Sequence, residues 1–126
     1  MFKKLNCFGS QPHHFSISEP YKFSFKQISE VEYEESFIIN VRGRLLEDLN
    51  DDDLFNHASE IAKTLYLKEI NRREHELRYY YYYYNITVNY VSLKKIIRFY
   101  SDEFGLNGRG VDGKEYYTII KSPVEM

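Results

Sequence analysis

The sequence predicts an α+β domain in which a mainly antiparallel sheet carries two helices on one face. Two kinds of apolar pattern support this prediction. Several segments alternate apolar and polar residues, which is the period of a half-buried strand. Two longer segments repeat their apolar residues every three to four positions, which is the period of an amphipathic helix. The predicted order is strand, strand, helix, strand, helix, strand, which is typical of the α+β class.

Length and composition fit one folded domain. The chain has 126 residues, of which 43% are hydrophobic and 29% charged, and only nine are Gly or Pro. These values are ordinary for a globular domain. The aromatic content is unusual, with thirteen Tyr and nine Phe but no Trp. A lone cysteine, Cys7, excludes a disulfide framework, and we find no secretory signal or long apolar run, so we expect a cytoplasmic protein.

The first third of the chain predicts an arm followed by two strands. Residues 1–20 contain scattered Gly, Pro and Ser and are expected to form an irregular arm or a loose first strand, so that the domain proper spans residues 21–126. A half-buried strand is predicted where aromatic and polar residues alternate, at Tyr21, Phe23 and Phe25. A charged turn around residues 29–35 leads to a second strand over residues 37–41, whose inward face carries Phe37, Ile39 and Val41.

Residues 50–72 predict the main helix. Asn50 is a suitable N-cap, and Asp51, Asp52 and Asp53 follow in the first turn, where the helix dipole favours negative charge. Basic residues gather at the other end of the segment. One apolar stripe at helical spacing is expected to face the sheet and comprises Leu54, Ala58, Ile61, Ala62, Leu65 and Ile70.

The second half predicts a tyrosine-rich strand, a second helix and a last strand. Residues 77–91 alternate, with an apolar even face that is expected to lie on the core (Tyr80, Tyr82, Tyr84, Ile86, Val88 and Tyr90). Ser92 is expected to cap a second helix whose inward residues are Leu93, Ile96, Ile97, Tyr100 and Phe104. Gly105 is expected to end that helix. A glycine-rich loop then leads to a short strand over residues 116–121.

The odd face of the tyrosine strand is the first candidate for contact with a partner. Tyr79, Tyr81 and Tyr83 keep hydroxyl groups that need water or a partner, and tyrosine is enriched in protein interfaces. Cross-strand aromatic packing within one sheet is the alternative interpretation. The acidic run Asp51, Asp52 and Asp53 is a second candidate docking patch, although helix capping also explains it. We therefore predict binding to a protein partner or self-association as a homo-oligomer.

A basic surface offers a different function. The residues that would form it lie at the end of the first predicted helix and on the polar face of the second: Arg72, Arg73, Arg78, Lys94, Lys95 and Arg98. Next to exposed tyrosines, such a surface can bind a nucleic acid, with phosphates on the cations and unpaired bases on the rings. A solvated helix face is the alternative interpretation, and the net charge of −2 is unlike that of a strongly basic nucleic-acid domain.

No motif predicts catalysis, a cofactor or a metal. Residues 108–115 have the G-x4-G-K spacing of a P-loop but end in Glu rather than Ser or Thr, and they precede a predicted strand rather than a helix. The aspartates near residue 50 lack the glycine and the terminal glutamate of a calcium loop. His57 and Glu60 lack the further ligands that a metal needs. We therefore expect a non-enzymatic protein.

One family resemblance follows from these segments. The opening Met1-Phe2-Lys3-Lys4-Leu5 with Phe8-Gly9-Ser10, the strand and helix that follow, and a helix leading to Phe104-Gly105-Leu106 resemble rhabdovirus matrix proteins. The chain departs from that family in lacking a proline-tyrosine motif and in its acidic charge. The resemblance implies a structural or accessory viral protein, in the host cytoplasm or the virion, that self-associates and contacts nucleocapsid or a membrane surface. A phage-type enzyme inhibitor and a toxin-immunity protein are alternative non-enzymatic functions.

Overall fold

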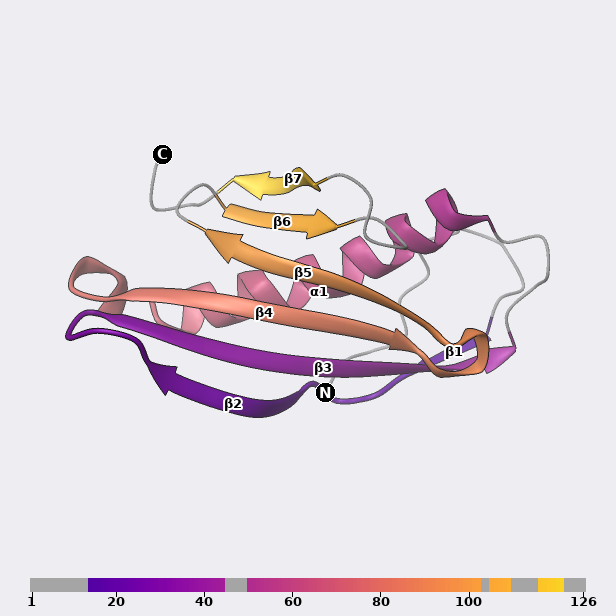
Figure 1. The fold of residues 1–126 in the computed structure, drawn as a ribbon, viewed down its shortest axis with the longest axis horizontal. Coiled ribbons are helices and arrows are strands. Elements are labelled where there is room, and N and C mark those ends of the chain that lie inside the picture. Colours follow the sequence, from indigo (N-terminus) through magenta and orange to yellow (C-terminus); the bar gives the residue numbers. More distant parts are fainter. Residues whose placement is uncertain (1–13, 45–49, 103–104, 110–115, 122–126) are drawn as a thin grey trace.

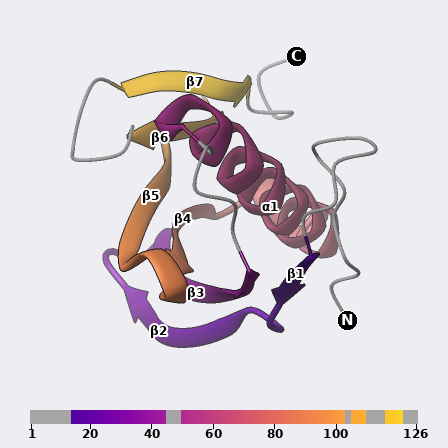
Figure 2. The ribbon, with the colours of Figure 1, turned by 90° about the vertical axis from the view of Figure 1, so that its right-hand side faces the viewer.

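The fold is one long helix lying across the concave face of a curled β-sheet (Figures 1 and 2). The computed structural model describes residues 14–44, 50–102, 105–109 and 116–121. Within these residues the helix is α1 (Asp51–Arg72), and two short 3-10 turns are η1 (Glu76–Arg78) and η2 (Val91–Leu93). The strands are β1 (His14–Ile17), β2 (Tyr21–Gln27), β3 (Glu32–Arg44), β4 (Tyr81–Tyr90), β5 (Lys95–Asp102), β6 (Gly105–Arg109) and β7 (Tyr116–Lys121). The predicted α+β class with a mainly antiparallel sheet is confirmed.

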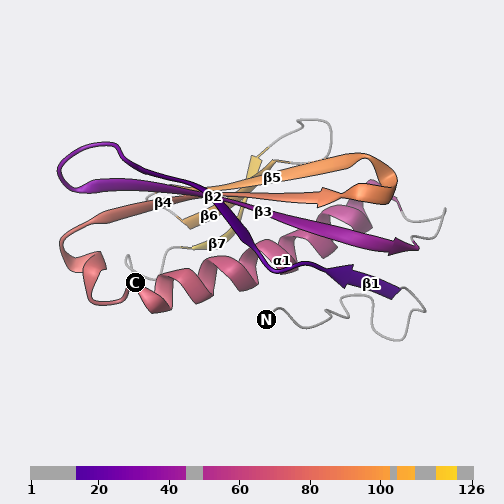
Figure 3. The same ribbon diagram turned by 90° about the horizontal axis from the view of Figure 1, so that it is seen from below.

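The described strands form one sheet in the order β1-β3-β4-β5-β6-β7. β2 also pairs with β3, along the same edge as β1 but over the other half of that strand. Every pairing is antiparallel except the one between β3 and β4, which is parallel over ten residue pairs. Parallel neighbours need a crossover connection, and α1 supplies it by packing against the face of the strands that it connects (Figure 3). This crossover places the end of α1 beside the start of β4.

The predicted main helix is confirmed. Asn50 caps it, because its side-chain oxygen accepts a hydrogen bond from the Asp53 backbone N–H at 2.8 Å. All six residues of the predicted stripe are buried, joined by Phe55 and Tyr66. Opposite them lie the inward residues of the sheet, which comprise Phe37, Ile39, Val41, Tyr84, Ile86, Val88, Tyr90, Ile97, Phe99 and Leu106. The predicted inward face of residues 37–41 is therefore confirmed.

The predicted second helix is wrong. Residues 91–93 form the 3-10 turn η2, Lys94 reverses the chain with a φ of 55°, and residues 95–102 form strand β5. Two adjacent β-branched residues followed by aromatics favour a strand. A buried serine concealed its period-two pattern, because Ser101 lies on the inward face, where its hydroxyl accepts a hydrogen bond from the Tyr84 backbone N–H at 2.7 Å. Gly105 begins β6 and does not end a helix.

The bounds and burial of four other strands also differ from the predictions. β2 is a strand as predicted, but it is exposed along almost its whole length rather than half-buried, because it lies at the sheet edge beyond the cover of α1. β4 begins at Tyr81 rather than at residue 77, so Tyr80 lies outside the strand and is exposed. The segment expected to form an irregular arm or a loose first strand contains β1, and the expected turn at residues 29–35 is shorter because β3 begins at Glu32.

The parity of β5 gives a test of the corrected fold. Ile97 is fully buried whereas Ile96 is 46% exposed on the opposite face of the sheet. We expect Ile97→Ala to lower the free energy of unfolding by about 2–5 kcal/mol, because it leaves a cavity in the core. Ile96→Ala should change it by less than about 1 kcal/mol. Urea unfolding of the two variants measures the difference, and equal losses would contradict the strand assignment, since a helix would turn both residues inward.

Candidate functional site

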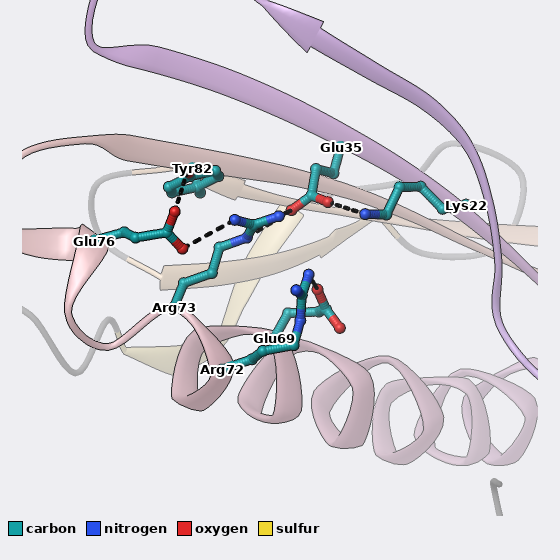
Figure 4. A network of polar contacts seen from close by, with 7 residues as sticks. All are labelled: Lys22, Glu35, Glu69, Arg72, Arg73, Glu76 and Tyr82. Atoms are coloured by element: carbon teal, nitrogen blue, oxygen red, sulfur yellow. Dashed lines mark hydrogen bonds and ion pairs between the residues drawn. The ribbon is translucent and has the colours of Figure 1, made fainter.

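A buried carboxylate joins the end of α1 to two strands of the sheet. Glu35 of β3 is fully buried, and its Oε2 lies 3.0 Å from both Nε and Nη2 of Arg73. Its other oxygen lies 2.6 Å from Nζ of Lys22 in β2, an ion pair that is less well aligned than a regular hydrogen bond. Burial alone would raise the pKa of Glu35, but Lys22 and Arg73 outweigh burial and hold that pKa below its ordinary value. Figure 4 shows the carboxylate between the two cations.

Arg73 extends this network towards the start of β4. Its guanidinium carbon lies 4.0 Å from the centre of the Tyr82 ring, and its Nη1 lies 3.1 Å from Oε2 of Glu76. The Tyr82 hydroxyl donates to the other oxygen of Glu76 at 3.2 Å. Arg73 also closes the last turn of α1, because its backbone N–H lies against the carbonyls of Glu69 and Ile70. One residue therefore fixes the helix end, η1 and the first residues of β4.

A second interaction is a row of aromatic rings across three strands. Tyr33 of β3 stacks on Phe25 of β2 at a ring separation of 5.6 Å and on Tyr82 of β4 at 5.2 Å. Tyr80 meets the edge of the same Tyr33 ring at 5.6 Å. The backbone N–H of Tyr81 donates to the carbonyl of Val31 at 2.7 Å, which joins the β2–β3 turn to the start of β4. Figures 1 and 3 show these two segments side by side beyond the last turn of α1.

Around this row the chain exposes large apolar side chains, which we call the aromatic end. Tyr79 is 70% exposed, Tyr21 66% and Tyr81 59%. The full set is Tyr21, Phe23, Phe25, Ile28, Val31, Tyr79, Tyr80 and Tyr81. Taking about 200 Å² for a whole aromatic side chain, its six aromatic members expose about 700 Å² together. Among the residues whose side-chain exposure the structure describes, Ile96 is the one comparably exposed large apolar residue outside this end.

The three predicted contact tyrosines have different environments. Tyr79 and Tyr81 belong to the aromatic end. Tyr83 lies on the face of the sheet opposite α1, is only half exposed, and donates its hydroxyl to Oε2 of Glu32 at 3.1 Å. The following residues of β4 on that face are polar (Asn85, Thr87 and Asn89), with an Asn40–Asn89 hydrogen bond at 3.1 Å between β3 and β4. The predicted parity is confirmed for the buried residues from Tyr84 onwards.

The acidic run does not join the tyrosines. Asp51, Asp52 and Asp53 form the first turn of α1, and Asp51 pairs with Lys95 at 2.8 Å. Lys95 lies opposite Tyr90 at the end of β4, whereas Tyr81 begins that strand. Ten residues of strand separate the two groups, which corresponds to about 30 Å. The structure therefore places the two predicted docking patches at opposite ends of the molecule.

The six predicted nucleic-acid residues do not form one surface. No helix face carries Lys94, Lys95 and Arg98, because these residues lie in a turn and in β5. Arg73 is buried between Glu35 and Glu76, and Arg72 pairs with Glu69 at 2.7 Å. Arg72, Arg73 and Arg78 lie near the end of α1. Lys94 and Lys95 lie at the opposite end of β4. The structure thus separates the six basic residues into two groups and pairs Arg72 and Arg73 with glutamates.

Three further features considered in the sequence are a metal site, a membrane-spanning helix and the P-loop-like segment. Within the part of the chain that the structure describes, no three His, Cys, Asp or Glu side chains are grouped as ligands for a metal ion. In the same residues, no helix combines the length and the apolar character needed to cross a membrane. Most of the P-loop-like segment, residues 110–115, lies outside the described residues, as does Cys7.

Sequence reasoning missed the β2 side of the aromatic end and the Glu35–Arg73 pair. The alternation of Tyr21, Phe23 and Phe25 predicted the strand but not its position at the edge of the sheet. Exposed lysines at residues 22 and 26 are a weak signal of an edge strand. The contact between Glu35 and Arg73 spans 38 residues, so no local pattern indicates it.

Comparisons with known proteins give no relative, since no protein-family model, no curated protein and no solved structure matches this chain. The resemblance to rhabdovirus matrix proteins therefore stays a prediction. One element on which it was based has changed, because the segment before residue 104 is strand β5 and not a helix.

The low pKa of Glu35 predicts how stability depends on pH. A folded-state pKa below the unfolded value of about 4.3 means that the ionised carboxylate stabilises the fold at neutral pH. That stability is lost as the pH falls below about 4. We expect the Glu35→Gln variant to be about 3 kcal/mol less stable at pH 7, because Arg73 keeps an uncompensated buried charge, and to lose less stability on acidification.

Urea unfolding between pH 7 and pH 3 measures both effects. Glu60→Gln is the matched control, since Glu60 is exposed on α1 and makes only a 3.9 Å surface ion pair with Lys63. Its profile should follow that of the wild type. Parallel profiles for the wild type and Glu35→Gln would contradict the assigned role of Glu35.

Proposed function

We propose that this chain is a non-enzymatic protein-binding domain that contacts its partner through the aromatic end. The observation that carries the proposal is the concentration of exposed large apolar side chains in two segments that lie side by side, residues 21–31 and 79–81. The exposed rings lie on both faces of this part of the sheet, because Tyr81 shares the face of Tyr83 whereas Phe25 stacks with Tyr33 on the face that carries α1. Tyrosine is also the residue type most often found, with Trp and Arg, where interfaces concentrate their binding energy.

Contacts among neighbouring side chains and backbone groups hold this surface in place, which favours a role in binding. The rings of Phe25, Tyr33 and Tyr82 stack across three strands on the face of the sheet that carries α1, and Arg73 lies over the Tyr82 ring. The Tyr81–Val31 backbone hydrogen bond holds the two segments at one distance. A surface fixed in advance loses little conformational entropy when it binds, so more of the contact energy contributes to affinity.

The more specific forms of this function share the same surface. A structural or accessory viral protein, a phage-type inhibitor and an immunity protein would each bury an aromatic surface of this kind against another protein. Self-association is the remaining form. Identification of the bound protein distinguishes these forms, and the proposal commits only to the surface that binds.

The experiment compares one double variant with one control. We expect Tyr79→Ser combined with Tyr81→Ser to leave the domain folded, because both side chains are mostly exposed. Capture of the partner from a lysate of the source cells by the immobilised domain should fall at least about tenfold, since central interface tyrosines contribute about 2 kcal/mol each. Mass spectrometry identifies and quantifies the captured protein.

Ile96→Ser is the matched control, because Ile96 is an exposed apolar residue on β5, outside the aromatic end. The partner is the protein whose capture falls with the tyrosine variant and persists with the Ile96 variant. If every captured protein persists with the tyrosine variant, the aromatic end is not the binding surface. Unfolding of the tyrosine variant, detected by circular dichroism, would show that the two residues belong to the core.

A further inference from the structure

The backbone edge of β2 is the part of the aromatic end that can accept another strand. Among the described strands β2 pairs with β3 alone, so its other edge carries backbone groups that no described strand binds. Three of its seven residues are exposed aromatics, Tyr21, Phe23 and Phe25. A free strand edge flanked by apolar side chains is the usual receptor for an extended segment of another protein, which adds to the sheet through backbone hydrogen bonds.

The charge of this end indicates which segment fits. Residues 21–35 and 73–81 hold six Glu and four Lys or Arg, giving a net charge of −2. The whole chain also has a net charge of −2, so its remaining residues are neutral overall. The excess negative charge of the protein is therefore located at the aromatic end.

Two of the four cations of this end belong to the buried network. Lys22 and Arg73 bind Glu35, and Arg73 also binds Glu76. Lys26 lies opposite Glu34 in the pairing of β2 with β3. Three further carboxylates belong to Glu30, Glu32 and Glu74, and Glu32 is held by hydroxyl donors, Ser29 at 2.9 Å and Tyr83 at 3.1 Å. Outside the buried network this end therefore holds four carboxylates, of Glu30, Glu32, Glu34 and Glu74, and two cations, Lys26 and Arg78, so a partner meets an excess of negative charge near the exposed rings.

This charge disfavours two other occupants. A second copy docked through the same end would bring two surfaces of net charge −2 together, and facing like charges weaken association. A nucleic acid would bring phosphates towards the same carboxylates. Basic side chains have the opposite preference, because ammonium and guanidinium groups pair with carboxylates and also bind the faces of tyrosine rings.

We infer that the β2 edge binds an extended segment of a partner protein in which Lys or Arg alternates with apolar residues. The backbone of that segment would continue the sheet beyond β2. Its basic side chains would reach Glu30, Glu32 and Glu74, and its apolar side chains would cover Phe23 and Phe25. This inference rests on the proposed function and adds the conformation and the charge of the partner segment.

The test selects ligands without knowledge of the partner. A displayed library of random ten-residue peptides is panned against the full chain, and the enriched peptides are sequenced. We expect enrichment of Lys and Arg at alternating positions among aromatic and β-branched residues. In an amide NMR titration, the best synthetic peptide should shift the signals of residues 21–27 and 79–81 most strongly.

Charge reversals then test the role of these carboxylates. Glu30→Lys and Glu74→Lys should each weaken the best peptide at least about fivefold at low salt, and added salt should reduce this difference. Glu60→Lys makes the same change of charge on the exposed face of α1 and should leave the affinity within about twofold. Equal effects of all three reversals would overturn the inference, because they would indicate net charge rather than the carboxylates of the aromatic end.

The remaining outcomes separate the inference from the proposed function. Two outcomes overturn the inference but leave a protein-binding aromatic end. One is that the peptides that shift the signals of residues 21–27 are not enriched in Lys or Arg. The other is a dimer held by β2 in analytical ultracentrifugation. A library that yields no ligand for β2 also overturns the inference. Loss of partner capture in the Tyr79 and Tyr81 variant would still support the proposed function in that case. Binding of a single-stranded 20-mer DNA to the aromatic end would overturn both.

Discussion

The fold and its surface depend on the buried contact between Glu35 and Arg73. It joins the fourth residue of β3 to the residue that ends α1, and through Lys22 it reaches the edge strand β2. Removing one member of such a pair leaves an uncompensated charge in the interior, which costs more than the pair itself contributes. The pair acts mainly as a constraint on geometry, because it determines where the helix stops and how η1 returns the chain to the sheet.

The lengths of the elements explain why an aromatic surface lies beyond that contact. The 22 residues of α1 span about 33 Å, whereas the 13 residues of β3 span about 43 Å. A helix of this length cannot cover the whole length of β3. The uncovered end has stacked rings in place of a helix, and Arg73 lies over the Tyr82 ring at the boundary. The aromatic end is thus a consequence of the architecture and also the best candidate for its function.

The sequence predicted those parts of the fold that local patterns determine. The cap at Asn50 and the apolar stripe placed α1 correctly, and parity placed Phe37 and Tyr84 on the core. The pattern after residue 92 fitted a helix because Ile96, Ile97 and Tyr100 have helical spacing. Ser101 concealed the strand, since its inward position depends on a hydrogen bond to another strand. Exposure of Phe23 and Phe25 likewise depends on the edge position of β2, which no local pattern contains, so the site was predicted only for Tyr79 and Tyr81.

The most direct test of this account is amide hydrogen exchange in the wild type and in an Arg73→Met variant. The Tyr81 N–H donates to Val31 and reports on the aromatic end, whereas the Val88 N–H lies in the middle of β4. The account predicts that the variant lowers the protection of Tyr81 at least about tenfold more than that of Val88, because local opening at the end no longer has to break the Arg73 contacts. An equal change at both amides, or none at Tyr81, would contradict the claim that the buried pair positions the aromatic end.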